Sequence, residues 1–287
     1  MAFFYPKVYA FFCYYRKKRR REEIEGKFTF FLQERLGPKK REKAVRHIFE
    51  LRGSRKVMNY LIPLMDEQFV KRYVTTEGLH YLDEGLKRGR GVVLMTSHFG
   101  NGPLAYSALR AMNYDLVFIK GGMERAEKRG RFRYVDALEN TIFIHDPSLS
   151  EVYQERILQT LRSGKIIHYY GDTREGRVKE NLPLLGRTMG FPTGVVRLAH
   201  EANAAIVPMI HLYQGGRITL IFKEPIDHDW KEGTDGYRRI VSEFVKLMET
   251  YLLALPEQYW GIYGPTVMSE YYRSLQKDSG SLKEDGR

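Results

Sequence analysis

Short apolar segments alternate with longer amphipathic segments from about residue 85 onward, and this alternation limits the possible fold more than any other feature. Apolar runs of five or six residues are typical of strands buried on both faces of a sheet, whereas the amphipathic segments are typical of helices. A helix between two strands returns the chain so that the strands can pair in parallel. We therefore expect an α/β fold, with a mainly parallel central sheet flanked by helices.

The spacing of apolar residues along the chain predicts the individual strands and helices. The expected strands span residues 91–96, 115–119, 141–144, 165–170, 205–212 and 217–222. The expected helices span residues 104–112, 125–138, 150–162, 192–202 and 237–255. Because only four residues separate the last two strands, we expect these strands to form a hairpin at the edge of the sheet.

The helical period also covers residues 22–75, which predicts an N-terminal helical region before the sheet. Gly37-Pro38 and Gly53-Ser54 are expected to divide this region into separate helices, because glycine and proline disfavour helix interiors. The chain is thus expected to have three parts. These are a surface segment of residues 1–21, an α/β domain with a helical entry over residues 22–276, and a disordered polar tail of residues 277–287.

Positive charge is concentrated at the N-terminus. Residues 1–60 contain 17 of the 47 Lys and Arg residues but only 6 of the 35 Asp and Glu residues, so the net charge of +12 lies almost entirely there. Eight aromatic residues occur within residues 1–15, and six consecutive basic residues follow at 16–21. A helix beginning near Pro6 places an apolar group on one side, which suits a helix lying in a membrane interface beside anionic headgroups. This apolar group is Val8, Phe11, Phe12 and Tyr15.

Other interpretations of the N-terminus stay open. Its aromatic residues can pack on the protein body, and a basic run can bind nucleic acid, although we expect no nucleic-acid partner. A secretory signal peptide is disfavoured because the positive charge follows the apolar segment. A membrane-spanning helix needs about 20 apolar residues in succession, and we expect none here. The sequence therefore predicts a peripheral protein at an anionic membrane surface.

The composition disfavours several classes of chemistry. The single cysteine, Cys13, cannot form an intramolecular disulfide, which favours a reducing, cytoplasmic environment. The histidines lack the spacing of metal ligands, so we expect no metal site. The sequence contains neither a phosphate-binding loop with Lys-Ser/Thr nor a Gly-x-Gly-x-x-Gly fingerprint. Nucleotide hydrolysis and dinucleotide redox chemistry are therefore disfavoured.

The segment that follows the first of these strands, residues 97–103, places a histidine where α/β enzymes bind their ligands. Its sequence is Ser-His-Phe-Gly-Asn-Gly-Pro, and it leads directly into a helix. Ligands of such folds gather beyond the carboxyl ends of the strands, where the next helix presents unpaired N–H groups. We expect His98 to act there on a polarised or anionic substrate. The polar segment 171–177, with Asp172, follows another strand and is expected at the same edge.

Both segments resemble the lysophospholipid acyltransferase superfamily, and especially its branch of lipid A biosynthesis (lauroyl or myristoyl) acyltransferases. The resemblance covers residues 40–265 approximately and rests on Thr96-Ser97-His98-Phe99-Gly100-Asn101 and on the block from 171 to 208. It implies a glycerolipid acyltransferase-like fold. It also implies transfer of a fatty acyl chain from acyl carrier protein or acyl-CoA to a hydroxyl of a lipid A-like glycolipid or a lysophospholipid. It implies no cofactor besides the acyl donor, and a location on the cytoplasmic face of the inner membrane.

The His-x-x-x-x-Asp/Glu motif of that family is incomplete, because Pro103 stands where the family has the carboxylate. The resemblance implies that His98 is the general base that deprotonates the acceptor hydroxyl. A carboxylate normally holds such an imidazole in the required tautomer and stabilises the imidazolium. We expect Asp172 to provide this carboxylate, with Glu175 as a weaker choice. The alternative is that Asp172 caps a turn or pairs with Arg174.

Further residues are candidates for substrate binding. Gly100, through its backbone, and Asn101, through its side chain, can donate hydrogen bonds to the developing oxyanion. Guanidinium and ammonium groups can bind phosphates of the acceptor or the donor, but each can equally be a solvated or salt-bridged surface residue. The candidates of this kind are Arg174, Arg187 and Lys120, the last within a basic loop of residues 120–133.

Two other functions stay open. A protein that keeps the fold without the motif carboxylate can bind lipid without catalysis, and a hydrolase would use water in place of the acceptor. The aromatic stretch 259–265 can either line an acyl channel or seal the core, and we favour the core.

Overall fold

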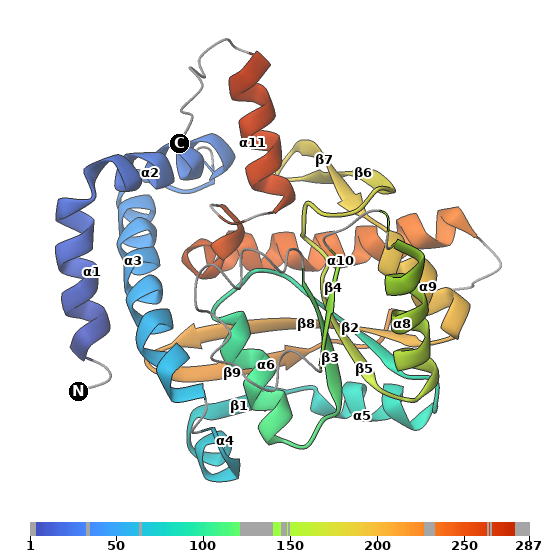
Figure 1. Ribbon diagram of the computed structural model, residues 1–287. Coiled ribbons are helices and arrows are strands. Elements are labelled where there is room, and N and C mark those ends of the chain that lie inside the picture. The colour runs from blue at the N-terminus through green and yellow to red at the C-terminus, as the bar shows by residue number, and fades with distance from the viewer. Residues whose placement is uncertain are drawn as a thin grey trace.

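A seven-stranded sheet forms the centre of the protein (Figure 1). The computed structural model describes residues 4–32, 35–62, 65–120, 140–144, 148, 150–226, 233–262, 264 and 266–278. The strands lie in the order β1-β9-β8-β2-β5-β3-β4, and all neighbours are parallel except β8 and β9. The expected α/β fold with a mainly parallel sheet is therefore confirmed. The strands are β1 (Val74–Glu77), β2 (Val92–Thr96), β3 (Leu116–Lys120), β4 (Thr141–Phe143), β5 (Ile166–Tyr170), β8 (Ala205–Gln214) and β9 (Arg217–Phe222).

Helices cover both faces of this sheet, which explains why its central strands are apolar throughout. All five residues of β2 are buried. Leu94 packs in a cluster with α5 (Leu79–Lys87) and α6 (Gly102–Ala111). Its neighbours Val93 and Met95 pack with helices of the other face. Those helices are α8 (Ser150–Arg162), α9 (Gly194–Ala202) and α10 (Thr234–Ala254), and Figure 1 shows α5 and α10 on opposite sides of the sheet.

The N-terminal helical region is confirmed, with one difference in its division. It consists of α1 (Phe4–Arg16), α2 (Lys18–Leu32), α3 (Pro38–Leu61) and α4 (Glu67–Tyr73). The break at Gly37-Pro38 is present, since Pro38 is the first residue of α3. The predicted break at Gly53-Ser54 is wrong, because α3 continues through both residues and buries them. Both residues are buried, and burial in tertiary structure can override the weak helix propensity of glycine.

The N-terminal segment is not separate from the protein body. The helix α1 packs along α3, and Figure 1 shows the two helices side by side at one end of the sheet. Ala10 and Tyr14 of α1 are buried, and the Tyr14 ring lies edge to face against Phe49 at a centroid distance of 5.8 Å. The expected boundary after residue 21 falls within α2.

Two paired regions differ from the sequence prediction. The hairpin of β8 and β9 is confirmed, but it is not at the sheet edge, because β1 pairs in parallel with β9. The short β1 was not predicted, because it follows α4 directly and no turn residues separate the two elements. A second, two-stranded sheet of β6 (Lys179–Leu184) and β7 (Arg187–Pro192) was not predicted. Its turn residues Leu185 and Gly186 both have positive φ, as in a two-residue hairpin turn, yet leucine is a poor signal for this conformation.

The remaining predictions concern the ends of segments. The helix α11 (Val267–Asp278) was not predicted and includes the first two residues of the expected tail. Residues 279–287 and the predicted helix 125–138 lie outside the described residues.

His168 makes the stability of this fold sensitive to acid. Its side chain is fully buried on β5 and stacks on Phe118 at a centroid distance of 5.1 Å, and neither ring nitrogen hydrogen bonds to another described residue. Burial, with a smaller contribution from His98, lowers the pKa of His168 to about 3. The unfolded state therefore binds a proton near the ordinary value of about 6.5, whereas the folded state does not. The contribution of His168 to the free energy of unfolding is therefore fully present above pH 6.5 and falls as the pH drops toward 3.

Replacement of this histidine should reduce the pH dependence. Between pH 7.5 and pH 5, His168 should lower the free energy of unfolding by about 2 kcal/mol, because only the unfolded imidazole gains a proton. Urea unfolding at the two pH values measures this loss, and His168→Phe should show a loss that is smaller by about that amount. His80→Phe, at an exposed position, should behave like the wild type. An equal pH dependence in His168→Phe and wild type would contradict the assignment.

Candidate active site

His98 and Asp172 lie together at the carboxyl edge of the sheet because their strands are neighbours in register. The strands β2 and β5 pair in parallel with Thr96 opposite Tyr170, and each polar residue follows its strand end by two positions. Equal offsets from paired strand ends bring the two side chains to the same point. The structure thus places Asp172 where the sequence analysis expected it, at the edge that carries His98.

The contact between these two residues is close and oriented. The Oδ1 atom of Asp172 lies 2.7 Å from the Nδ1 atom of His98, and the backbone N–H of His98 donates to Oδ2 at 3.0 Å. Asp172 is fully buried, whereas the His98 side chain is 19% exposed. An ionised carboxylate can only accept hydrogen bonds, so Nδ1 of His98 carries the proton in this contact. The Nε2 atom, which has no hydrogen-bond partner among the described residues, is then the basic nitrogen.

Tyr259 adds a third donor to the carboxylate. Its hydroxyl donates to Oδ2 of Asp172 at 2.7 Å, and its side chain is fully buried. Burial and, second, the charge of Asp172 raise the pKa of Tyr259 well above its ordinary value, so the phenol stays protonated and remains a donor. A buried charge is costly unless it is paired and hydrogen bonded. The three donors meet this requirement for Asp172.

The segment that carries Tyr259 holds both polar loops by backbone contacts. It contains the short helices η5 (Pro256–Gln258) and η6 (Trp260–Ile262). The N–H of Trp260 donates to the carbonyl of His98 at 2.6 Å, and that of Gly100 donates to the carbonyl of Gln258 at 2.7 Å. At the start of α11, the N–H of Val267 donates to the carbonyl of Asp172 at 3.1 Å. The C-terminal segment therefore fixes the loops after β2 and β5 relative to each other.

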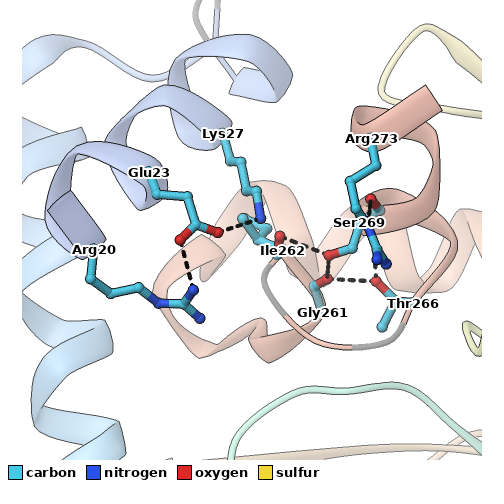
Figure 2. A network of polar contacts seen from close by, with 8 residues as sticks. All are labelled: Arg20, Glu23, Lys27, Gly261, Ile262, Thr266, Ser269 and Arg273. Atoms are coloured by element: carbon cyan, nitrogen blue, oxygen red, sulfur yellow. Dashed lines mark hydrogen bonds and ion pairs between the residues drawn. The ribbon is translucent and has the colours of Figure 1, made fainter. Parts of the chain in front are cut away.

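Buried hydroxyls in turn fix the C-terminal segment (Figure 2). The hydroxyls of Thr266 and Ser269 both donate to the carbonyl of Gly261, at 2.5 and 3.1 Å. Ser269 also lies 2.9 Å from the carbonyl of Ile262. Figure 2 shows this network beside α2, where Glu23 binds Arg20 and the buried Lys27. The turn after Tyr259 is thus anchored by the helix that follows it.

The loop after His98 leads into α6 with two unusual features. Gly100 has a φ of +44°, and a Cβ atom there would lie 2.8 Å from the carbonyl oxygen of His211, so only glycine fits. Asn101 is 2% exposed, and within the described part of the chain neither its amide nitrogen nor its amide oxygen has a hydrogen-bond partner. Pro103 occupies the first turn of α6, where a missing N–H has no penalty.

The three basic residues predicted to bind substrate phosphates do not form one cluster around His98 and Asp172. Arg174 forms an ion pair with the adjacent Glu175, 3.4 Å apart, and Glu175 also accepts a hydrogen bond from Thr173. Glu175 is therefore engaged with these two residues, whereas Asp172 contacts His98 directly. Arg187 lies over the ring of Phe30 at 3.8 Å and donates to its carbonyl, which ties β7 to α2. Lys120 is the last residue of β3, and its side chain lies outside the described residues together with the basic loop that follows it.

The hydrogen bond from the hydroxyl of Tyr259 to the site was not predicted from the sequence. The stretch 259–265 was expected to seal the core, and the ring of Tyr259 does pack on Phe99 at a centroid distance of 5.0 Å. Its hydroxyl, however, reaches a carboxylate 87 positions earlier. A buried tyrosine needs a partner for its hydroxyl, and this was the available signal.

The described part of the protein has neither a metal-binding cluster nor a helix suited to spanning a membrane. Across the described ranges, no group of three or more His, Cys, Asp or Glu side chains could hold a metal ion. Likewise, none of the described helices has both the length and the apolar character needed to span a membrane.

The comparisons with known proteins agree with the resemblance seen in the motifs. The family model described as bacterial lipid A biosynthesis acyltransferase matches residues 7–263. No match was found among curated proteins. The matched range includes His98, Asp172 and Tyr259, and it covers most of the chain. The chain therefore belongs to the family of bacterial lipid A biosynthesis acyltransferases.

Proposed function

We propose that the protein is a peripheral membrane O-acyltransferase in which His98 is the general base and Asp172 is its orienting carboxylate. The family supports transfer of an acyl chain to a lipid acceptor. The donor is a thioester of acyl carrier protein or CoA, and the acceptor is a hydroxyl of a lipid A-like glycolipid or a lysophospholipid. The observation that carries this proposal is the 2.7 Å contact between His98 Nδ1 and the buried carboxylate of Asp172.

The proposed reaction uses the basic Nε2 atom of His98. This atom removes the proton of the acceptor hydroxyl as the hydroxyl oxygen attacks the carbonyl carbon of the thioester. Asp172 stabilises the imidazolium that forms, and it keeps Nδ1 protonated before the step. When the tetrahedral intermediate collapses, the carbon–sulfur bond breaks and the sulfur takes the proton from Nε2. His98 is then ready for the next acceptor.

The developing oxyanion needs donors that are already in place. The amide of Asn101 is buried and has no hydrogen-bond partner among the described residues, which supports a role for this side chain. The predicted N–H of Gly100 instead donates to the carbonyl of Gln258, so the backbone donor that we propose is that of Gly102, the first residue of α6. For the phosphate groups of the substrates we retain Lys120 and Arg174, and the side chain of Arg174 is 27% exposed two positions after Asp172. Arg187 is a weaker candidate, because its guanidinium already packs on Phe30.

The proposed membrane contact is made by α1. This helix buries Ala10 and Tyr14 against α3 but leaves Phe11, Phe12 and Tyr15 exposed by 62%, 57% and 54%. These three residues are followed by the exposed basic residues 16–19. An exposed aromatic face beside positive charge fits an anionic bilayer surface. We propose that this surface is the cytoplasmic face of the inner membrane.

Loss of either His98 or Asp172 should strongly reduce acyl transfer. Radiolabelled acyl chains from acyl carrier protein and from CoA, supplied with total membrane lipid, measure the reaction. His98→Ala and Asp172→Asn should each lower the rate by at least about a hundredfold. The first variant lacks the general base, and the second lacks the carboxylate that keeps the imidazole in the required tautomer. The exposed control variants His80→Ala and Asp235→Asn should retain the wild-type rate.

Three results of that experiment would contradict the proposal. Transfer that persists in His98→Ala would show that His98 is not the general base. No transfer by the wild type from either donor would favour a lipid-binding protein without catalysis. Release of free fatty acid that does not depend on added lipid would instead indicate a hydrolase.

Tyr259→Phe should weaken both the fold and the reaction. The buried carboxylate loses one of three donors, so the free energy of unfolding should fall by about 1–3 kcal/mol. The carboxylate that contacts His98 is then held by fewer hydrogen bonds, which should lower kcat. Tyr251→Phe is a matched control, because its ring also packs near Phe99 but its hydroxyl has no partner among the described residues. Equal unfolding free energies and equal kcat values for the two variants would contradict this role.

Membrane binding should depend on the exposed face of α1. Replacement of Phe11, Phe12 and Tyr15 by serine should lower binding to phosphatidylglycerol vesicles at least tenfold in a flotation assay, because the buried apolar area is lost. The matched control replaces Val152 and Val178, which are exposed by 54% and 66% on other elements, and should bind normally. Equal binding of both variants would show that α1 is not the contact. Equal binding of the wild type to phosphatidylcholine vesicles would exclude the electrostatic contribution.

A further inference from the structure

Tyr170 occupies the space between the base and the start of α6. It is the last residue of β5, and its ring stacks on the imidazole of His98 with a centroid distance of 4.2 Å and an interplanar angle of 27°. At the other end of the ring, a Cβ atom on Gly102 would overlap the hydroxyl oxygen of Tyr170. The hydroxyl therefore lies directly against Gly102, the first residue of α6.

Space, and not backbone conformation, requires glycine at position 102. Gly102 is absent from the glycines with positive φ, so its backbone could accept another residue. Any larger residue would displace the Tyr170 hydroxyl. The two positions thus form a complementary pair in which the missing side chain at 102 makes room for the tyrosine.

The position of the hydroxyl is defined by packing on several sides. The Tyr170 ring contacts Phe118 edge to face at 5.8 Å, His168 at 5.4 Å and His211 at 6.3 Å. A ring enclosed in this way keeps its hydroxyl in place before the substrate binds. Preorganised donors of this kind stabilise charge in a transition state more than mobile ones do.

The surroundings of the hydroxyl suit a negative charge. The helix α6 is 10 residues long and begins at Gly102, so its unpaired N–H groups point to this region. The preceding residue, Asn101, contributes the buried amide that has no partner in the described part of the chain. The base His98 lies on the face of the same tyrosine ring.

We propose that Tyr170 is a further catalytic residue, whose hydroxyl donates a hydrogen bond to the thioester carbonyl oxygen as this oxygen becomes an oxyanion. The inference rests on the proposed acyl transfer. The acceptor oxygen forms the new carbon–oxygen bond, its proton passes to Nε2 of His98, and the carbonyl electron pair moves to the oxygen held by Tyr170. The pair returns as the carbon–sulfur bond breaks, and the sulfur takes the proton from His98. Tyr170 keeps its own proton throughout.

A set of three variants separates the hydroxyl from the ring. Tyr170→Phe keeps the stacking on His98 and should lower kcat about a hundredfold, with KM changed by less than about threefold, because the donor acts only in the transition state. Gly102→Ala displaces the Tyr170 ring and should lower both the melting temperature and kcat. The double variant should recover most of the melting temperature, since the added Cβ meets the remaining ring carbon at 3.1 Å, but its kcat should stay as low as that of Tyr170→Phe.

Tyr106→Phe is the control for loss of a hydroxyl nearby. Its ring lies on the same face against Phe118, but its hydroxyl reaches the carbonyl of Leu116. Its kcat should stay within about threefold of the wild type.

The outcomes distinguish this inference from the function on which it rests. A His98-dependent transfer that Tyr170→Phe leaves at the wild-type rate would overturn the role of Tyr170 alone. A change confined to KM would overturn it too, because the hydroxyl would then act in substrate binding. Recovery of kcat in the double variant would show that only ring packing matters. No transfer by the wild type would overturn both proposals.

Discussion

The buried carboxylate of Asp172 is the group on which the arrangement of the site depends. It accepts hydrogen bonds from the imidazole and the backbone of His98 and from the hydroxyl of Tyr259. A carboxylate without solvent contact is stable only while such donors stay in place. The parallel register of β2 and β5 positions the first two donors, and the C-terminal segment positions the third. Elements from three parts of the chain thus meet at one charge.

The location of this carboxylate explains how His98 has a carboxylate partner in a chain with Pro103 five positions after the histidine. A carboxylate at position 103 would come from the first turn of α6, whereas Asp172 comes from the loop after the neighbouring strand. Both places belong to the same carboxyl edge of the sheet. Pro103 is compatible with the start of α6. Pro103 is therefore accommodated in the first turn of α6, and the imidazole has a carboxylate partner at 2.7 Å.

Local patterns predicted much of this molecule. The apolar runs gave β2 and β5 nearly to the residue, and the rule that parallel strands end at one edge was sufficient to pair His98 with Asp172. Features set by distant contacts were not predicted. Arg187 packs on Phe30, 157 positions earlier in the chain, and Tyr259 reaches Asp172 through a turn anchored by α11. The continuous α3 and the hairpin turn at Leu185 depend on tertiary packing that overrides residue propensity.

The tautomer of His98 tests the central claim most directly, because Asp172 can orient the base only by keeping the proton on Nδ1. Nitrogen-15 NMR of protein labelled at histidine reports this proton, and the His98 signals are those absent from His98→Ala. With neutral imidazole, the wild type should show a protonated Nδ1 and an unprotonated Nε2, and Asp172→Asn should lose this preference. A wild-type His98 protonated at Nε2, or an equal mixture of the two tautomers, would contradict the assignment of Asp172 as the orienting carboxylate.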